Sequence, residues 1–113
     1  MKARLPEGVQ MKRGDMMRQV QKFQEEREAL AADLESREYD VAAGGGAVNL
    51  KIDGTLRVTE IKIAPEIIDP DDPETLEDII VAAVNEGIQR VQDASANEMS
   101  ALAAKYGIPD GAF

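Results

Sequence analysis

Apolar residues recur with two different periods along this chain, and the first of them is helical. From Met16 the apolar positions fall at steps of three or four residues, which predicts a helix over 15–36 with one narrow apolar side. These positions are Met16, Val20, Phe23, Leu30 and Leu34. Such a helix is about 33 Å long at 1.5 Å per residue. Because one narrow stripe cannot enclose a core, this helix needs a partner.

The middle of the chain alternates apolar and polar residues, which is the period of a strand with one buried face. Three strands are predicted, at 37–43, 47–53 and 56–63. The short turns between them make neighbouring strands antiparallel. Within the third strand the apolar phase changes between Val58 and Ile61, which predicts a β-bulge near Thr59.

Three consecutive glycines, 44–46, separate the first two strands. A phosphate-binding loop would have to lead into the N-terminus of a helix, usually with a Lys-Ser or Lys-Thr pair beside it. An alternating strand pattern follows instead, beginning at Val48. We therefore interpret the glycines as a turn, and Asp53-Gly54 as the turn of the second hairpin.

A second, longer helix has clear signals at both ends. Asp72 is placed as its N-cap and Pro73 as its first residue, and the helix is expected to reach Tyr106, where Gly107 ends it. Its apolar stripe over 76–91 is wide enough to lie on a sheet. The stripe then thins to alanines, so the far end of the helix is expected to project.

This order of elements predicts an α+β fold, with an N-terminal helix, a three-stranded antiparallel meander and a long C-terminal helix. The expected divisions are a flexible basic arm over 1–14, a single domain over 15–107 and a tail over 108–113. A three-stranded sheet leaves an edge and an apolar face to cover, and aromatic residues make up only 4% of the chain. A homodimer that buries a shared face is therefore expected.

The residue types that the chain lacks exclude most catalytic and metal chemistry. None of the 113 residues is Cys or His, which removes disulfides, thiolate ligands, Cys nucleophiles and the commonest general base. The acidic cluster over 69–74 lacks the Gly and the late Glu of an EF-hand calcium loop, and helix capping explains it better. No carboxylate pair has a neighbouring nucleophile. We expect no enzymatic activity, no metal and no cofactor.

No apolar run approaches the ~20 residues of a membrane span, and the N-terminus lacks the apolar core of a signal peptide. The sequence therefore predicts a cytoplasmic protein without a membrane partner.

Charge is distributed unevenly along the chain. Residues 1–37 hold eight basic and seven acidic residues, whereas 38–113 hold five and fifteen, so the two parts carry +1 and −10 of the net charge of −9. Such a protein does not coat nucleic acid with its whole surface, and any anion is expected at the N-terminal part. The candidate phosphate contacts are Lys12, Arg13, Arg18 and Lys22, with Arg90 and Lys105 of the second helix as weaker candidates. A solvated helix face, with Lys22 next to Glu25 and Glu26, explains the first cluster about equally well.

The ordered combination of these segments resembles the YbaB/EbfC family of small nucleoid-associated proteins. The matching segments are MMRQVQKFQEE, GGGAVNLKIDGTLRVTEIKIAPEII and DPDDPETLEDIIVAAVNEGIQRVQDASANEM, which lie between residues 16 and 99. The resemblance implies a homodimer whose sheets join into one central layer and whose helices project like tweezers. It also implies binding of double-stranded DNA with loose or no sequence preference in the bacterial nucleoid, alongside other nucleoid or DNA-repair proteins.

Two classes of function remain open at this point. One is a dimeric architectural protein that contacts DNA phosphates through its basic N-terminal region. The other is a dimeric adaptor that grips another protein with its thin helix ends, while its acidic surface repels DNA. Charge favours the adaptor and the resemblance favours DNA binding, and we expect DNA binding.

Overall fold

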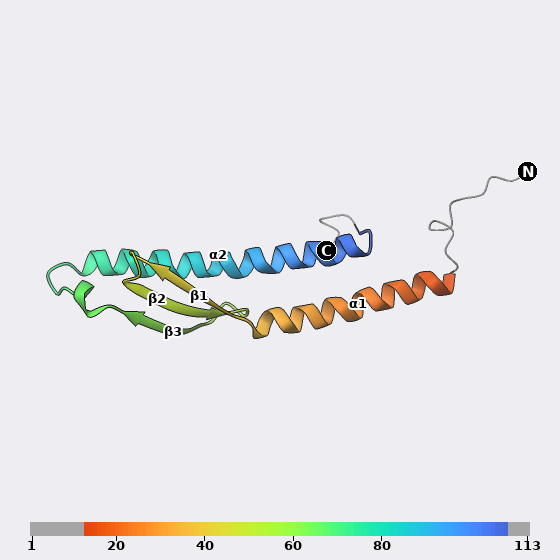
Figure 1. Cartoon of the computed structure of the whole chain (residues 1–113), viewed down its shortest axis with the longest axis horizontal. Helices are drawn as coiled ribbons and strands as arrows, with labels where there is room; N and C mark the ends of the chain where they lie inside the picture. Colours follow the sequence, from red (N-terminus) through yellow and green to blue (C-terminus); the bar gives the residue numbers. More distant parts are fainter. Residues whose placement is uncertain (1–12, 109–113) are drawn as a thin grey trace, which may run out of the picture.

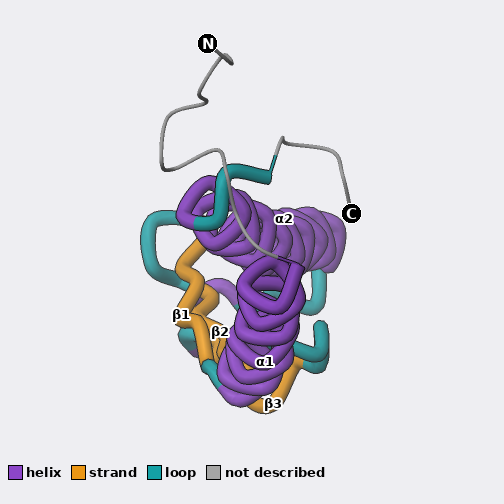
Figure 2. The backbone as a smooth tube through the Cα atoms, turned by 90° about the vertical axis from the view of Figure 1, so that its right-hand side faces the viewer, coloured by secondary structure: helices purple, strands orange, loops and turns teal. Residues whose placement is uncertain are grey.

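The computed structural model describes residues 13–108, which form two helices, a short 3-10 helix and one sheet. In chain order these are α1 (Arg13–Ser36), β1 (Glu38–Ala43), β2 (Val48–Asp53), β3 (Val58–Ile63), η1 (Pro65–Ile67) and α2 (Pro73–Lys105). α2 crosses the sheet and continues past it, and α1 lies beside the far half of α2 (Figure 1). Figure 2, which looks along the molecule, shows the same pairing of the two helices. The predicted α+β architecture is confirmed.

The sheet is an antiparallel meander with the strand order β1-β2-β3. Its register shifts once, because Lys51 pairs with Glu60 whereas the next residue, Ile52, pairs with Val58. Thr59 is therefore the extra residue on β3, and the predicted bulge is confirmed. The bulge keeps Val58 and Ile61 on the same side of the sheet, although they are three residues apart.

The triglycine segment is a turn between β1 and β2. Gly44, Gly45 and Gly46 have φ angles of 63°, 68° and 93°, in the left-handed region that side chains disfavour. The N–H of Gly46 donates to the carbonyl of Ala43 at 3.2 Å, which closes the turn. The interpretation of these glycines as a bend between strands is confirmed.

The second hairpin differs from the prediction, because its loop is longer than Asp53-Gly54. The carboxylate of Asp53 accepts the N–H groups of Thr55 and Arg57 at 2.8 and 3.1 Å, which holds a wide loop in place. Leu56, predicted in the third strand, lies in this loop with a φ of 66°. The apolar residue at position 56 had the right phase for a strand, but the side-chain hydrogen bonds of Asp53 favour the loop.

The core lies between α2 and the first two strands. Its most buried large side chains are Val41, Val48, Leu50 and Ile52, each exposed by 2% or less. Gly87 of α2 lies directly over Ile52, since a Cβ at this glycine would be 3.2 Å from Ile52 Cγ2. The absent side chain thus lets the helix approach the sheet closely. α2 does not cover β3 in the same way, and Val58 and Ile61 of this strand are 40% and 42% exposed.

The far half of α2 leaves the sheet, as expected. There α1 packs against it, and Leu34 of α1 and Ala103 of α2 are buried. α1 begins at Arg13, two residues before the predicted start. Residues 13 and 14 of the predicted arm over 1–14 are therefore helical, and residues 1–12 lie outside the described residues. A narrow stripe on α1 and an alanine-rich stripe on α2 are complementary, because small side chains let two helices approach closely.

Both predicted ends of α2 are found. The N-cap Asp72 accepts the N–H of Thr75 at 3.4 Å. At the other end Gly107 has a φ of 71°, and the N–H of Ile108 donates to the carbonyl of Ala103 at 2.8 Å. This is the hydrogen-bond pattern of a Schellman C-cap, which stops the helix where the glycine predicted.

Candidate nucleic-acid interface

α1 is the element that reaches beyond the rest of the described molecule. Phe23 packs edge-on against Tyr106 just after the end of α2, with the ring centroids 5.4 Å apart. The ten residues before Phe23, residues 13–22, are called the α1 tip below, and every one of them is exposed. A segment about 15 Å long is thus accessible around the whole helix, at 1.5 Å per residue.

The α1 tip is basic in an acidic protein. It carries Arg13, Arg18 and Lys22 against Asp15, which gives a net charge of +2. The Nη1 atom of Arg18 lies 3.6 Å from Oδ1 of Asp15, and both side chains are well exposed, so water screens this pair. Lys12, the fourth predicted contact, lies outside the described residues. Three of the six predicted contacts therefore lie together on one helix end.

The two basic residues of α2 are held by other parts of the chain. Arg90 donates to the carbonyl of Asp40 on β1 and lies 3.6 Å from Glu86. The Nζ atom of Lys105 lies 2.9 Å from Oε1 of Glu26 on α1. Arg90 and Lys105 thus have structural roles, and neither lies on the α1 tip.

Glu26 holds the end of α2 against α1. Its carboxylate accepts a hydrogen bond from the hydroxyl of Tyr106 and a second from Lys105. The Tyr106 hydroxyl is the main reason that the pKa of Glu26 is lowered, and Lys105 adds to the effect. The same bond to the carboxylate raises the pKa of Tyr106 to about 12. We call this group the Glu26 clamp.

Arg37 makes a second clamp where α1 meets the sheet. Its guanidinium donates to Asp33 on α1, with Nη2 2.6 Å from Oδ2, and to Glu98 on α2, with Nη2 3.0 Å from Oε1. These two carboxylates, Glu98 first, raise the pKa of Arg37. The Arg37 clamp therefore links α1 to α2 at the point where α1 leads into β1.

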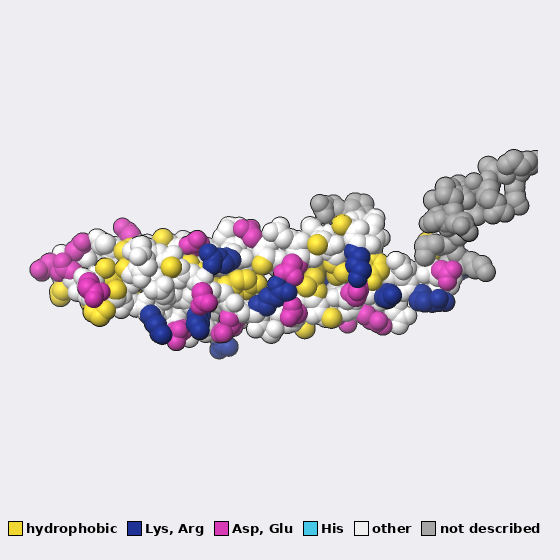
Figure 3. Space-filling model, in the orientation of Figure 1, with side chains coloured by type: hydrophobic (Ala, Val, Ile, Leu, Met, Phe, Trp, Pro, Cys, Tyr) yellow, Lys and Arg dark blue, Asp and Glu magenta, His cyan; other side chains and the backbone are white. Residues whose placement is uncertain are grey.

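The opposite end of the molecule is strongly acidic. Residues 64–89 hold eight acidic residues and no Lys or Arg. Figure 3 shows acidic side chains gathered where α2 begins, whereas basic and acidic side chains are interspersed along the rest of the molecule. A polyanion is therefore repelled from the acidic end and attracted to the α1 tip.

The exposed apolar side of the α1 tip was not predicted from the sequence. Met16, Met17 and Val20 are 54%, 67% and 57% exposed. Met16 and Val20 were assigned to the stripe that covers a partner helix, but α2 ends before it reaches them. The length of α2 relative to α1 would have been the only signal for this exposure, and it depends on where the two helices cross.

Several other kinds of site are absent from residues 13–108. Within this range no group of three Asp, Glu, His or Cys side chains is arranged to hold a metal ion. Every buried side-chain nitrogen or oxygen there has a hydrogen-bond partner. None of the described helices is both long and apolar enough to cross a membrane.

Comparisons with known proteins agree on one family. A sequence model of the YbaB/EbfC DNA-binding family matches residues 10–106. A nucleoid-associated protein of Alkaliphilus oremlandii is 45% identical over 102 residues, which are 90% of this chain and 88% of that protein. One of Clostridium acetobutylicum is 39% identical over 95 residues, or 84% and 85% of the two chains.

A solved structure supports the fold independently. The crystal structure of an uncharacterized protein from Helicobacter pylori matches with a TM-score of 0.61 and covers 78% of this chain and 92% of its own. Its sequence is 18% identical, so this likeness concerns the fold alone.

Proposed function

Because this chain belongs to the YbaB/EbfC DNA-binding family, we propose that it is a homodimeric nucleoid-associated protein that binds double-stranded DNA. Binding has loose or no sequence specificity and rests mainly on phosphate contacts. It takes place in the bacterial cytoplasm, on the nucleoid, where other nucleoid or DNA-repair proteins are also expected as partners.

One observation carries this proposal, namely that the exposed α1 tip has a net charge of +2 in a chain whose net charge is −9. Arginine and lysine bind phosphate without reading base edges, and each neutralised phosphate releases counterions. Arg13, Arg18 and Lys22 are exposed on the α1 tip, and Lys12 precedes them in the sequence. The acidic end of the molecule lies far from this tip, so its repulsion of DNA is weakened by salt over a Debye length of about 8 Å.

The proposed dimer covers the apolar surface beside β3. Val58 and Ile61 are exposed on the face of the sheet that α2 covers over β1 and β2. Arg90 marks the side of α2 that lies towards β1, because it donates to Asp40. Val81 and Val84 lie on another side of the helix, at about 100° per residue, and therefore flank β3. A two-fold axis beside β3 would bring two copies of this patch together and place an α1 tip on each side.

The test is a titration of duplex DNA at several salt concentrations. A plot of log K against log salt should have a slope near −3.6 per chain if Lys12, Arg13, Arg18 and Lys22 neutralise four phosphates, at about −0.9 each. Changing all four residues to Ala should flatten the slope and weaken all sequences alike. The matched control is Arg90→Ala, which removes one positive charge elsewhere and should have a smaller effect on the slope.

The adaptor function is the second candidate, and the exposed methionines of the α1 tip favour it. If the native protein binds no DNA even at ~50 mM salt, where phosphate contacts are strongest, the DNA-binding proposal is wrong. If the quadruple variant binds DNA with an unchanged slope, DNA contacts another surface.

A further inference from the structure

The α1 tip presents an apolar side that phosphate contacts do not use. Met16, Met17 and Val20 are all more than half exposed, although methionine and valine are usually found inside proteins. In a folded protein such a side chain on a projecting element is a sign of a binding surface. Phosphates offer nothing apolar to these residues.

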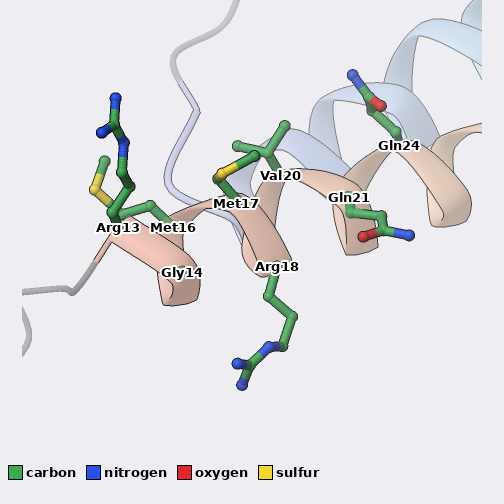
Figure 4. Close-up of a pocket in the computed structure, with 8 residues that line it drawn as sticks. All are labelled: Arg13, Gly14, Met16, Met17, Arg18, Val20, Gln21 and Gln24. Carbon is green, nitrogen blue, oxygen red and sulfur yellow. The ribbon is translucent and has the colours of Figure 1, made fainter.

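The apolar side also carries hydrogen-bonding groups. Figure 4 shows Met16, Met17, Val20 and Gln24 projecting from one side of α1, with Arg13 on the same side at its end. Arg18 projects from the opposite side. This side of α1 therefore combines apolar, amide and guanidinium groups, and the opposite side carries a further cation, Arg18.

The size of the α1 tip fits one feature of DNA. An α-helix with its side chains is about 10–12 Å wide, and the major groove of B-DNA is about 12 Å wide whereas the minor groove is about 6 Å wide. Because α2 ends beside Phe23, a single helix extends from there, and all of its sides are exposed. The acidic end of α2 lies at the other end of the molecule.

We propose that the α1 tip enters the major groove, where Met16 and Met17 contact the C5-methyl groups of thymine. The inference rests on the proposed function and adds to it a preference of a few fold for thymine-containing sites. The thymine methyl is the apolar group that the major groove displays, and the amide of Gln24 matches the donor and acceptor of adenine beside it.

Electrostatics favours DNA over an apolar groove of another protein as the occupant. The three cations of the α1 tip outnumber its one carboxylate, Asp15, which lies next to Arg18. The tip is thus complementary to a polyanion, whereas the rest of the described part of the chain is acidic overall. In the groove, Arg13 approaches base edges or phosphates from the methionine side, and Arg18 reaches the phosphate backbone from the other side.

The experiment compares a short A·T-rich duplex with the same duplex in which deoxyuridine replaces every thymidine, so that only the methyl groups are lost. The native protein should bind the deoxyuridine duplex about fourfold more weakly for each methyl group that it buries. The double variant Met16→Ala, Met17→Ala should bind the thymidine duplex as weakly as the native protein binds the other. It should lose nothing further when the methyl groups are removed.

Arg18→Ala is the matched control, because it should weaken binding to both duplexes by the same factor. Circular dichroism should report unchanged helix content for the double variant, since alanine favours helix and both methionines are exposed. Equal affinity of the native protein for the two duplexes would overturn the inference. An equal loss for native and double variant on removal of the methyl groups would overturn it too. In both cases DNA binding itself, and with it the proposed function, would still hold.

Discussion

The two ends of this molecule are held together by different forces. At one end α2 lies on the sheet over four large side chains that are almost completely buried, and Gly87 brings the helix close to Ile52. At the other end α1 and α2 pack against each other, and we call this pair of helices the arm. Few apolar side chains are buried between the two helices, and the Arg37 and Glu26 clamps that also join them are partly exposed. Buried apolar area is insensitive to salt, whereas exposed ion pairs are screened by it.

This difference matches the roles that we propose. The sheet end specifies the fold and the dimer, and the arm holds out a binding surface. An arm kept by weak, exposed pairs can open without unfolding the sheet, which is expected of elements that bind ligands. The following changes test the division, beginning with the junction on which both ends depend.

Gly54→Ala should have the largest effect, because Gly54 lies where the β2–β3 loop contacts the end of α1. A Cβ at this position would be 1.8 Å from the backbone oxygen of Leu34, and the N–H of Gly54 donates to the carbonyl of Arg37 at 2.9 Å. Neither backbone can move without breaking the junction. We expect a loss of about 3 kcal/mol or more in the free energy of unfolding, measured by urea denaturation.

Gly45→Ala is the control for this variant. Nothing lies within 4 Å of a Cβ at Gly45, but its φ of 68° disfavours a side chain. The expected loss is therefore about 1–2 kcal/mol, from backbone strain alone. A Gly54 variant no less stable than the Gly45 variant would show that the junction tolerates movement.

Ile61→Lys should have the next largest effect, on assembly and not on the fold of one chain. Ile61 is 42% exposed beside the uncovered edge of the sheet, so a lysine there can remain solvated in a monomer. In the proposed dimer the same lysine would be buried at the interface without a partner. Light scattering should give about twice the mass of 12.3 kDa for the native protein and the monomer mass for the variant. A native monomer would disprove the dimer directly.

The sequence predicted the sheet end more completely than the arm, for a physical reason. Strand periodicity, the Thr59 bulge and the caps at Asp72 and Gly107 are local signals, and each was found where the pattern placed it, except that Leu56 lies in the loop before β3. The Arg37 and Glu26 clamps join residues 61 to 80 positions apart. No local pattern encodes which carboxylate such a side chain meets. For the same reason the exposed apolar side of the α1 tip could not be predicted, because it depends on where α2 ends relative to α1 in space.

Arg37→Gln should loosen the arm while it leaves the sheet end unchanged. The variant loses the ion pairs to Asp33 and Glu98, which are partly exposed and therefore stabilise the arm only weakly. Amide hydrogens of α1 should then exchange about two- to fivefold faster, and those of β2 at the native rate. Glu98→Gln, which removes one pair, should give a smaller change. Equal acceleration in both regions would mean that the arm does not open by itself.

The smallest expected effect is the pH dependence of the Glu26 clamp. The pKa of Glu26 is lowered from 4.5, so this carboxylate contributes stability above pH 4.5 that is lost as the pH falls through the lower folded-state value. The pKa of Tyr106 is raised from 10.0 to about 12, so its hydroxyl contributes stability below pH 10 that is lost as the pH rises towards 12. With Tyr39→Phe to leave one tyrosine, absorbance at alkaline pH should report a Tyr106 midpoint well above 10, and Glu26→Gln should return it towards 10. A midpoint that Glu26→Gln does not move would show that the two side chains are not bonded in solution, and the end of the arm would then be held by the Phe23 contact and the Lys105–Glu26 ion pair.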